Sequence, residues 1–204
     1  MFKDKLHPHL VSSLSAAEIV NPTEIQKVSI PKIKSGANVL CIAPEKSGKT
    51  SSIVINVIQR LDRELNDVPR AIILVENDER GLEMVELFKM LGSNTNLRVY
   101  CVKPKVSMQK QKEIIYFGMD IVIGTSKQIN DLFSFNAINI NDLKMFIIDD
   151  ADLVIKSERI VVINRIATSI PKSQQILFAK VETDKISRFI EKYMENVVIV
   201  ESIV

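Results

Sequence analysis

The chain has 204 residues, 46% of them hydrophobic and 25% charged, and 27 Lys and Arg against 25 Asp and Glu leave a net charge of +2. This composition excludes a disordered chain, and the near-neutral charge excludes indiscriminate attraction to nucleic acid or anionic lipid. No run approaches the roughly 18 apolar residues that span a bilayer, so we predict a cytoplasmic protein without membrane contact. Cys41 and Cys101 lie in apolar runs, which favours buried thiols in a reducing compartment.

Short apolar runs of strand length alternate with longer amphipathic stretches along the chain. The predicted helices are residues 23–34, 49–65, 78–91, 107–117, 158–169 and 184–195. The predicted strands are residues 38–43, 71–76, 97–102, 120–124, 144–149, 175–179 and 197–201. This alternation is typical of βαβ units, so we expect an α/β fold with a doubly wound, mostly parallel sheet flanked by helices.

The first predicted strand runs into a polar loop that ends where the next helix begins. Residues 41–50 read Cys-Ile-Ala-Pro-Glu-Lys-Ser-Gly-Lys-Thr. A strand, a tight loop and a helix start in this order direct backbone N–H groups and the positive helix end toward an anion. Lys49 would supply charge to the outer phosphates of a nucleotide, and the Thr50 hydroxyl would bind Mg²⁺. The alternative is a capped helix start that binds no ligand.

A second candidate feature is the apolar strand 144–149, which ends in acidic residues. Asp149 and Asp150 follow the buried run directly, and Asp152 comes two residues later. Carboxyl ends of parallel strands meet at one edge of a sheet, so Asp149 is predicted to lie near the phosphate loop and to hold Mg²⁺ through water. The alternative for Asp150 and Asp152 is that they cap the next helix.

A third motif, Pro-Thr-Glu-Ile-Gln at residues 22–26, precedes these two. In order and spacing, the three resemble the Q motif, the phosphate loop and the Asp-Glu-Ala-Asp motif of the DEAD-box RNA helicases. The resemblance covers nearly the whole chain but only the N-terminal RecA-like lobe of that family. It implies one domain over residues 1–204, with a Q-motif region at 1–35 and a core at 36–204. ATP and Mg²⁺ are the implied cofactors.

The resemblance also implies roles for single residues. Gln26 would read the adenine edge and Phe2 would pack on the base, although a solvent-facing helical glutamine is the alternative for Gln26. Thr50 and Asp149 would hold Mg²⁺, while Lys49 and Asp150 would take part in catalysis. The implied phosphate-binding residues are Lys46, Ser47, Gly48, Lys49 and Thr50.

Several motifs depart from the family pattern. Lys46 stands where the family has glycine, and a β-carbon there opposes a turn built for glycine by about 1–2 kcal/mol. Asp150 stands where a glutamate positions the attacking water, and a misplacement of about 1 Å can reduce the rate on the order of 100-fold. The coupling motif Ser-Ala-Thr is Ala-Lys-Val at residues 179–181. We therefore expect hydrolysis to suffer more than binding.

The RNA-contact motifs are altered as well. Pro-Thr-Arg-Glu-Leu-Ala is Glu-Asn-Asp-Glu-Arg-Gly at residues 76–81, and the new acids would repel phosphates. Thr-Pro-Gly-Arg is Thr-Ser-Lys-Gln at residues 125–128, and Gly-Gly is Lys-Pro at residues 103–104. Thr125, Lys127 and Lys103 remain as candidate RNA contacts, and the alternative for these lysines is a solvated surface.

The sequence thus predicts a divergent DEAD-box helicase-like domain that binds ATP–Mg²⁺ and has weak or no ATPase or unwinding activity alone. The reason is that the family's second lobe supplies an arginine finger, a group worth about 10³ to 10⁵ in rate. Expected partners are nucleotide, RNA and a protein that supplies a second lobe. The alternative is a nucleotide-independent module that binds RNA or protein. A P-loop kinase or GTPase fits less well, because no Asn-Lys-x-Asp signature follows the acidic strand.

Overall fold

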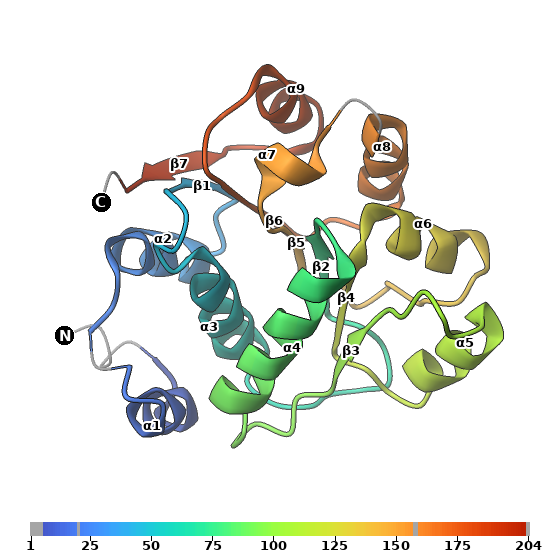
Figure 1. Ribbon diagram of the computed structural model, residues 1–204, viewed down its shortest axis with the longest axis horizontal. Coiled ribbons are helices and arrows are strands. Elements are labelled where there is room, and N and C mark those ends of the chain that lie inside the picture. Colours follow the sequence, from blue (N-terminus) through green and yellow to red (C-terminus); the bar gives the residue numbers. More distant parts are fainter. Residues whose placement is uncertain (1–5, 20, 157–158, 203–204) are drawn as a thin grey trace.

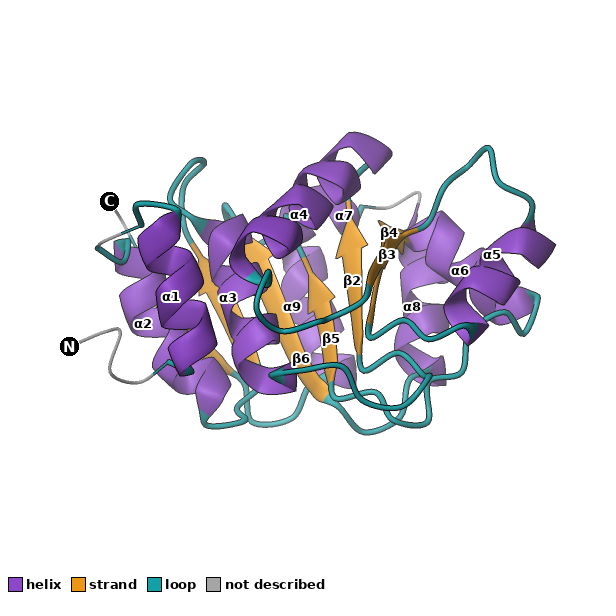
Figure 2. Cartoon of the chain, turned by 90° about the horizontal axis from the view of Figure 1, so that it is seen from below, coloured by secondary structure: helices purple, strands orange, loops and turns teal. Residues whose placement is uncertain are grey.

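The computed structural model describes residues 6–19, 21–156 and 159–202, in which one parallel sheet lies between two layers of helices (Figures 1 and 2). The strands are β1 (Val39–Ile42), β2 (Ala71–Val75), β3 (Val99–Cys101), β4 (Ile121–Thr125), β5 (Met145–Ile148), β6 (Gln174–Ala179) and β7 (Val198–Glu201). The helices are α1 (Pro8–Ala16), α2 (Glu24–Lys34), α3 (Lys49–Leu61), α4 (Asp78–Leu91), α5 (Met108–Tyr116), α6 (Ser126–Ser134), α7 (Ala151–Val154), α8 (Ile160–Ser169) and α9 (Asp184–Tyr193).

The strands follow the order β3-β4-β2-β5-β6-β1-β7, and every neighbouring pair is parallel. The predicted doubly wound α/β sheet is therefore confirmed. Strand β6 lies between β1 and β5. The loops that follow β1, β6 and β5 consequently emerge side by side at the carboxyl edge of the sheet, where ligands of such sheets bind.

The β-branched composition of the strands serves two separate cores. Successive strand residues point to opposite faces, so Ile72 and Leu74 of β2 pack in one core, and Ile73 and Val75 in the other. Helices α1 to α4 contribute to the core that holds Ile73, and helices α5 to α9 to the core on the opposite face. Burial on both faces explains the near-continuous apolar runs in the sequence.

Three helices were not predicted from the sequence. Helix α1 starts with Pro8, a residue favoured at the first helical position. Helix α6 starts at a capping box, in which the Thr125 N–H donates to Gln128 Oε1 at 2.8 Å. Helix α7 is a single turn after the acidic strand end. In addition, α3 ends at Leu61 rather than at residue 65, because Asp62 has a left-handed φ of 61°.

At the amino edge of the sheet, a buried carboxylate joins three strands. Asp120, Arg70 and Arg98 each directly precede a strand, and we call them the Asp120 cluster. Asp120 is fully buried and accepts from Arg70 Nη2 at 2.6 Å and from Arg98 Nε at 2.9 Å. It also accepts from the backbone N–H groups of Leu65 and Arg98 at 3.2 and 3.0 Å. Burial acts to raise the pKa of Asp120, but these hydrogen bonds outweigh it and hold the pKa below its ordinary value.

Two further sequence predictions concern the thiols and the membrane. Cys41 and Cys101 are buried and form no disulfide, as predicted. Among the described residues, the structure contains no helix with the length and apolar character that a bilayer crossing requires.

Candidate functional site

Gln26 lies buried in the first turn of α2, with 2% of its surface exposed. Its Oε1 accepts the Thr23 backbone N–H at 3.0 Å, and its Nε2 donates to Ser51 Oγ at 2.9 Å. The second bond ties α2 to the first turn of α3, so Gln26 is not the solvent-facing glutamine of the alternative interpretation. A glutamine amide can form four hydrogen bonds, which leaves capacity for a base edge. Phe2, the other predicted adenine contact, lies outside the described residues.

The phosphate loop forms a tight turn although Lys46 stands where the resemblance implies glycine. Lys46 has a φ of 59° and Gly48 a φ of 94°, both in the left-handed region. Gly48 is needed there, because a β-carbon would lie 2.9 Å from Thr23 Oγ1. Lys46 is exposed, so its side chain does not fill the loop. Ser47 Oγ donates to the Pro44 carbonyl at 2.7 Å, which braces the turn.

Lys49 is buried at the centre of this loop, with 5% of its surface exposed. Its ammonium donates to the carbonyl oxygens of Ala43 and Pro44 at 3.1 and 3.0 Å. The same ammonium lies 3.7 Å from Asp150 Oδ1. The lysine charge is thus held directly under the loop, next to the acidic strand end, by partners that a phosphate could replace.

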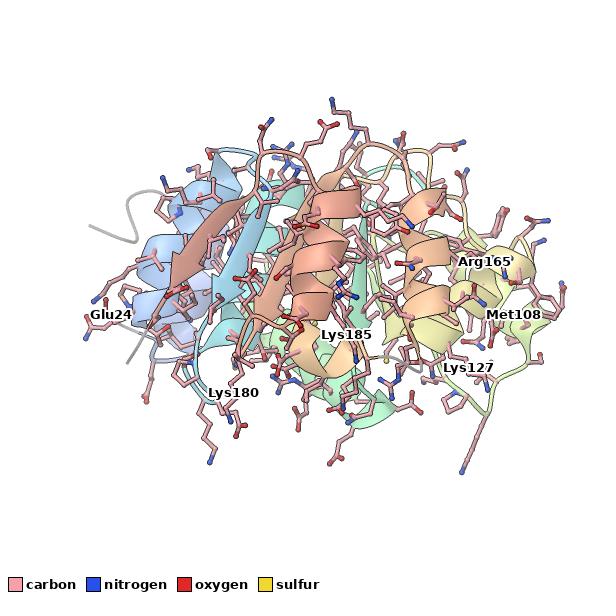
Figure 3. All side chains as sticks on the ribbon, turned by 90° about the horizontal axis from the view of Figure 1, so that it is seen from above. Glu24, Met108, Lys127, Arg165, Lys180 and Lys185 are labelled. Carbon is pink, nitrogen blue, oxygen red and sulfur yellow. The ribbon has the colours of Figure 1, made fainter. Side chains whose placement is uncertain are left out.

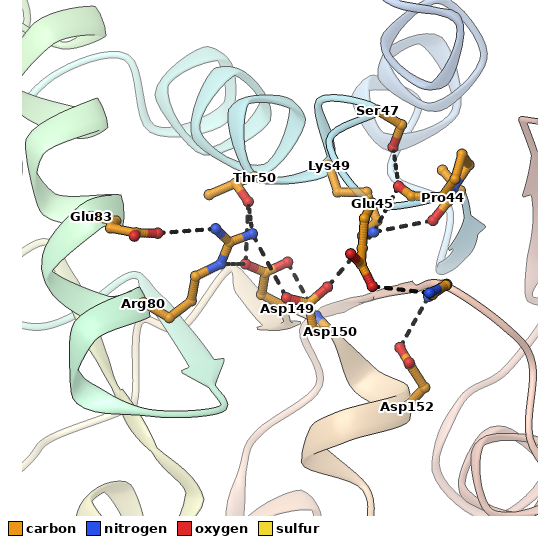
Figure 4. A network of polar contacts seen from close by, with 12 residues as sticks. Pro44, Glu45, Ser47, Lys49, Thr50, Arg80, Glu83, Asp149, Asp150 and Asp152 are labelled. Atoms are coloured by element: carbon orange, nitrogen blue, oxygen red, sulfur yellow. Dashed lines mark hydrogen bonds and ion pairs between the residues drawn. The ribbon is translucent and has the colours of Figure 1, made fainter. Parts of the chain in front are cut away.

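Thr50 and Asp149 come together as predicted, with Thr50 Oγ1 donating to Asp149 Oδ2 at 3.5 Å. The structure adds a residue that the sequence analysis missed, Arg80 in the first turn of α4 (Figure 4). Its Nε donates to Asp149 Oδ2 at 3.2 Å, and its Nη2 donates to Thr50 Oγ1. The Thr50 hydroxyl and the Asp149 carboxylate, which are the groups predicted to serve Mg²⁺, are therefore each already bonded to a guanidinium group.

The charge on Asp149 is poorly compensated despite this arginine. Asp149 is fully buried, and burial together with the neighbouring Asp150 carboxylate raises its pKa to about 6, against the lowering effect of Arg80. Asp150 has a left-handed φ of 46°, and its backbone N–H donates to Asp149 Oδ1 at 3.1 Å. The Asp150 side chain forms no capping bond to α7. It lies 3.7 Å from both Lys49 and Arg80.

Lys180, which stands where the resemblance implies the coupling motif, links the end of β6 to the phosphate loop. Its ammonium lies 2.9 Å from Glu45 Oε1, and the hydrogen bond from Lys180 lowers the pKa of Glu45. The Lys180 backbone N–H donates to Asp152 Oδ1 at 3.0 Å, so Asp152 binds this strand end. Figure 3 shows Lys180 and Lys127 along the same edge of the molecule.

A cleft of about 530 Å³ opens between the phosphate loop, the start of α4 and the end of β6. Lys46, Lys49, Arg80 and Lys180 are the cationic side chains that line it. The carboxylates that line it are Glu45, Glu76, Glu79, Glu83, Asp150 and Asp152. Acidic groups thus outnumber basic ones around the place where a nucleotide's phosphates would lie, which weakens the attraction to an anion.

The predicted RNA contacts lie farther along the same edge. Thr125 and Lys127 line a second hollow of about 380 Å³, and Lys103 is exposed outside its lining. Thr125 caps α6, and Gln128 Nε2 donates to Asp78 Oδ1 at 2.6 Å. The hollow's charged lining residues are Lys127, Glu76, Asp78 and Asp131. The structure therefore brings Thr125 and Lys127 together in mainly acidic surroundings.

Comparison with known proteins places these features in a family. The sequence profile described as DEAD/DEAH box helicase matches residues 23–179. The chain is 27% identical over 194 residues to the DEAD-box ATP-dependent RNA helicase CshB of Bacillus cereus, covering 93% of this chain and 44% of that protein. It is 28% identical over 192 residues to the ATP-dependent rRNA helicase RRP3 of Lodderomyces elongisporus, covering 94% and 38%. The chain thus spans less than half the length of these relatives.

A crystal structure of a DEAD box protein from the hyperthermophile Methanococcus jannaschii superposes with a TM-score of 0.89 at 27% identity. The match covers 96% of this chain and 54% of that protein. The shared fold is the RecA-like lobe that the sequence predicts.

Proposed function

The chain belongs to the DEAD/DEAH box helicase family, and from this membership we propose that it is a divergent lobe that binds ATP and hydrolyses it weakly or not at all on its own. One observation carries the proposal. The buried ammonium of Lys49 lies inside an intact phosphate loop, and the side chain of Gln26 is bonded to the helix that follows this loop. Lys49 thus offers a positive charge to phosphates, and the Gln26 amide offers hydrogen bonds to a nucleotide base beside them.

In the proposed complex, the phosphates lie on the loop and on the first turn of α3. Lys49 exchanges its two carbonyl partners for phosphate oxygens, whose negative charge strengthens the hydrogen bonds that the ammonium donates. Lys46, exposed at the loop, adds a second cation. The remaining hydrogen-bonding capacity of Gln26 serves the adenine edge. The excess of carboxylates in the cleft limits the affinity.

Mg²⁺ fits this site poorly. Thr50 and Asp149 supply oxygen ligands of the kind Mg²⁺ prefers, and Mg²⁺ would offset phosphate charge there. However, Arg80 bonds Thr50 Oγ1 and Asp149 Oδ2, and the Asp150 N–H bonds Asp149 Oδ1, so the residues present leave no coordination site for the ion. We therefore assign no step of the function to a metal.

Weak hydrolysis follows from Asp150 and from the single lobe. The Asp150 side chain is one carbon–carbon bond, about 1.5 Å, shorter than the glutamate it replaces, and it lies between Lys49 and Arg80. An arginine finger from a second lobe would have to come from another protein or from sequence outside these 204 residues. We expect substantial hydrolysis only when such a lobe is present.

The second candidate is a nucleotide-independent binding module. The three carboxylates around Thr125 and Lys127 favour a protein over RNA as its partner, because acids repel phosphates. Filter binding of single-stranded RNA over a salt series tests the RNA contacts, including Lys103. Retention that falls steeply with salt would support RNA binding, and absence of retention would contradict it. The cytoplasmic location stays a prediction.

Calorimetric titration of ATP, once with MgCl₂ and once with excess EDTA, tests the proposed function. We expect binding in at least one condition and a loss of at least about tenfold in affinity for Lys49→Ala. Lys89→Ala is the matched control, since Lys89 is exposed on α4 and pairs with Glu86. Equal heats for wild type and Lys49→Ala in both conditions would overturn the proposal. Rapid phosphate release by the isolated chain would contradict the proposal that it hydrolyses ATP weakly.

A further inference from the structure

Arg80 lies at the point where the phosphate loop and the acidic strand end meet. Its backbone is fixed by the helix start, because the Arg80 N–H donates to the side chain of Asn77 at 2.9 Å. The next residue, Gly81, lets the first turn of α4 lie close to the sheet, since a β-carbon there would be 2.7 Å from Cys101 Sγ. The guanidinium is thereby directed toward Asp149 at the end of β5 (Figure 4).

Every nitrogen of the guanidinium has an acceptor nearby. Nε bonds Asp149, Nη2 bonds Thr50, and Nη1 donates to Glu83 at 3.1 Å. Nη2 also lies 3.7 Å from Asp150 Oδ2. The Arg80 side chain is 31% exposed and lines the cleft beside the phosphate loop, so it reaches both the acidic strand end and the ligand space.

A guanidinium in this position excludes a divalent cation. Mg²⁺ requires oxygen ligands at about 2.0–2.1 Å in a near-octahedral shell, most of them water. The oxygens of Thr50 and Asp149, 3.5 Å apart, are joined by Arg80 instead. Arginine stays charged at any physiological pH, and its planar fork matches phosphate oxygens. It can therefore supply in permanent form the positive charge that a metal would bring.

The geometry points to Arg80 as a built-in counter-cation that replaces the divalent metal, so that this lobe takes its adenine nucleotide in the metal-free form. This inference rests on the proposed nucleotide binding and defines the ligand more closely. The guanidinium contacts the outer phosphates across the cleft from Lys49, while Asp149 holds it from behind.

The test compares ATP affinity in MgCl₂ and in excess EDTA for the full chain, by displacement of a fluorescent ATP analogue. We expect the wild-type affinities to agree within about twofold. For Arg80→Leu we expect binding at least about tenfold tighter with Mg²⁺ than with EDTA. Arg60→Leu is the matched control, because Arg60 is an exposed arginine in the last turn of α3, and it should behave as wild type.

A second measurement uses the metal alone and needs no nucleotide. Mn²⁺ titrations followed by electron paramagnetic resonance should show binding to Arg80→Leu that disappears in Arg80→Leu/Asp149→Asn. Any Mn²⁺ binding that wild type shows should persist in Asp149→Asn, so that none of it depends on Asp149. Circular dichroism verifies that each variant is folded, and the wild-type measurements remain decisive if Arg80→Leu is not.

The outcomes separate this inference from the proposed function. Wild-type ATP binding that is lost in EDTA overturns the role of Arg80 and leaves nucleotide binding intact. Mn²⁺ binding by wild type that depends on Asp149 overturns it as well. Absence of nucleotide binding in both conditions overturns the proposed function, and with it the inference that the nucleotide binds without metal.

Discussion

Two fully buried aspartates, each paired with arginine, lie at opposite edges of the same sheet. Asp120 at the amino edge accepts hydrogen bonds from Arg70, Arg98 and two backbone N–H groups. Asp149 at the carboxyl edge has one arginine, one hydroxyl and one backbone N–H, and a second carboxylate beside it. The pKa of the first is lowered, and that of the second is raised to about 6.

The contrast shows that burial and an arginine partner do not by themselves distinguish a structural carboxylate from a functional one. Asp120, at the start of β4, is surrounded by donors from the starts of β2 and β3 and from Leu65, so its charge is compensated and it joins the three strands. Asp149 keeps partly compensated negative charge directly behind Asp150 and Arg80, which line the cleft, and such a charge can attract a cation or tune a ligand. The completeness of the donor set separates the two roles.

The largest effect is expected from Asp120→Asn. Removing one partner of a buried ion pair costs about 3–5 kcal/mol, because Arg70, 4% exposed, is left without its counter-charge. Urea unfolding measures the loss of stability. Asp67→Asn is the control, since Asp67 pairs with Arg98 at 3.0 Å from an exposed position and should cost at most about 1 kcal/mol. Equal losses for both variants would contradict the structural role of Asp120.

Acidification should reduce the difference between wild type and Asp120→Asn. A carboxylate whose pKa is lowered on folding adds stability above its unfolded pKa of about 3.9 and loses it as the pH falls through the folded value. The stability difference should thus be constant near neutral pH and shrink below about pH 4. Urea unfolding at a series of pH values measures it. A difference that grows on acidification would contradict the lowered pKa.

Asp149→Asn is expected to cost less than about 1 kcal/mol in the same unfolding assay. The amide removes a charge that burial and Asp150 disfavour, and its oxygen still accepts from Arg80. If this variant loses as much stability as Asp120→Asn, the two carboxylates are equivalent and the comparison fails.

The smallest effect concerns backbone strain at the carboxyl edge. Lys46→Gly should raise the free energy of unfolding by about 0.5–1 kcal/mol. The reason is that the strain of a β-carbon in the left-handed turn exceeds the entropic cost of glycine's added flexibility. Thermal unfolding measures the gain. Asn96→Gly is the control, since Asn96 also has a positive φ of 54° but asparagine tolerates it. A loss of stability for Lys46→Gly would show that the lysine side chain contributes contacts of its own.

Local sequence patterns predicted the parallel sheet and the meeting of Thr50 with Asp149, because both follow from the direction of parallel strands. They did not predict Arg80. Residues 76–81 stand in the resemblance where an RNA-contact motif is expected, which suggests no role at the acidic strand end. The contact of Arg80 with Asp149 depends on β2 lying beside β5, an order that no local pattern encodes. The Asp120 cluster was missed for the same reason, since a charged residue before a strand usually lies in a solvated loop.

Gly81 makes the first turn of α4 easier to open. Glycine in a helix interior destabilises the helix by about 0.5–1 kcal/mol relative to alanine. Here it directly follows the residue that reaches Asp149, in a turn held by the Asn77 cap. Fraying of this turn withdraws the guanidinium from the strand end, so the amide hydrogens of residues 80–82 should exchange faster than those of the following turns, and bound nucleotide should slow them.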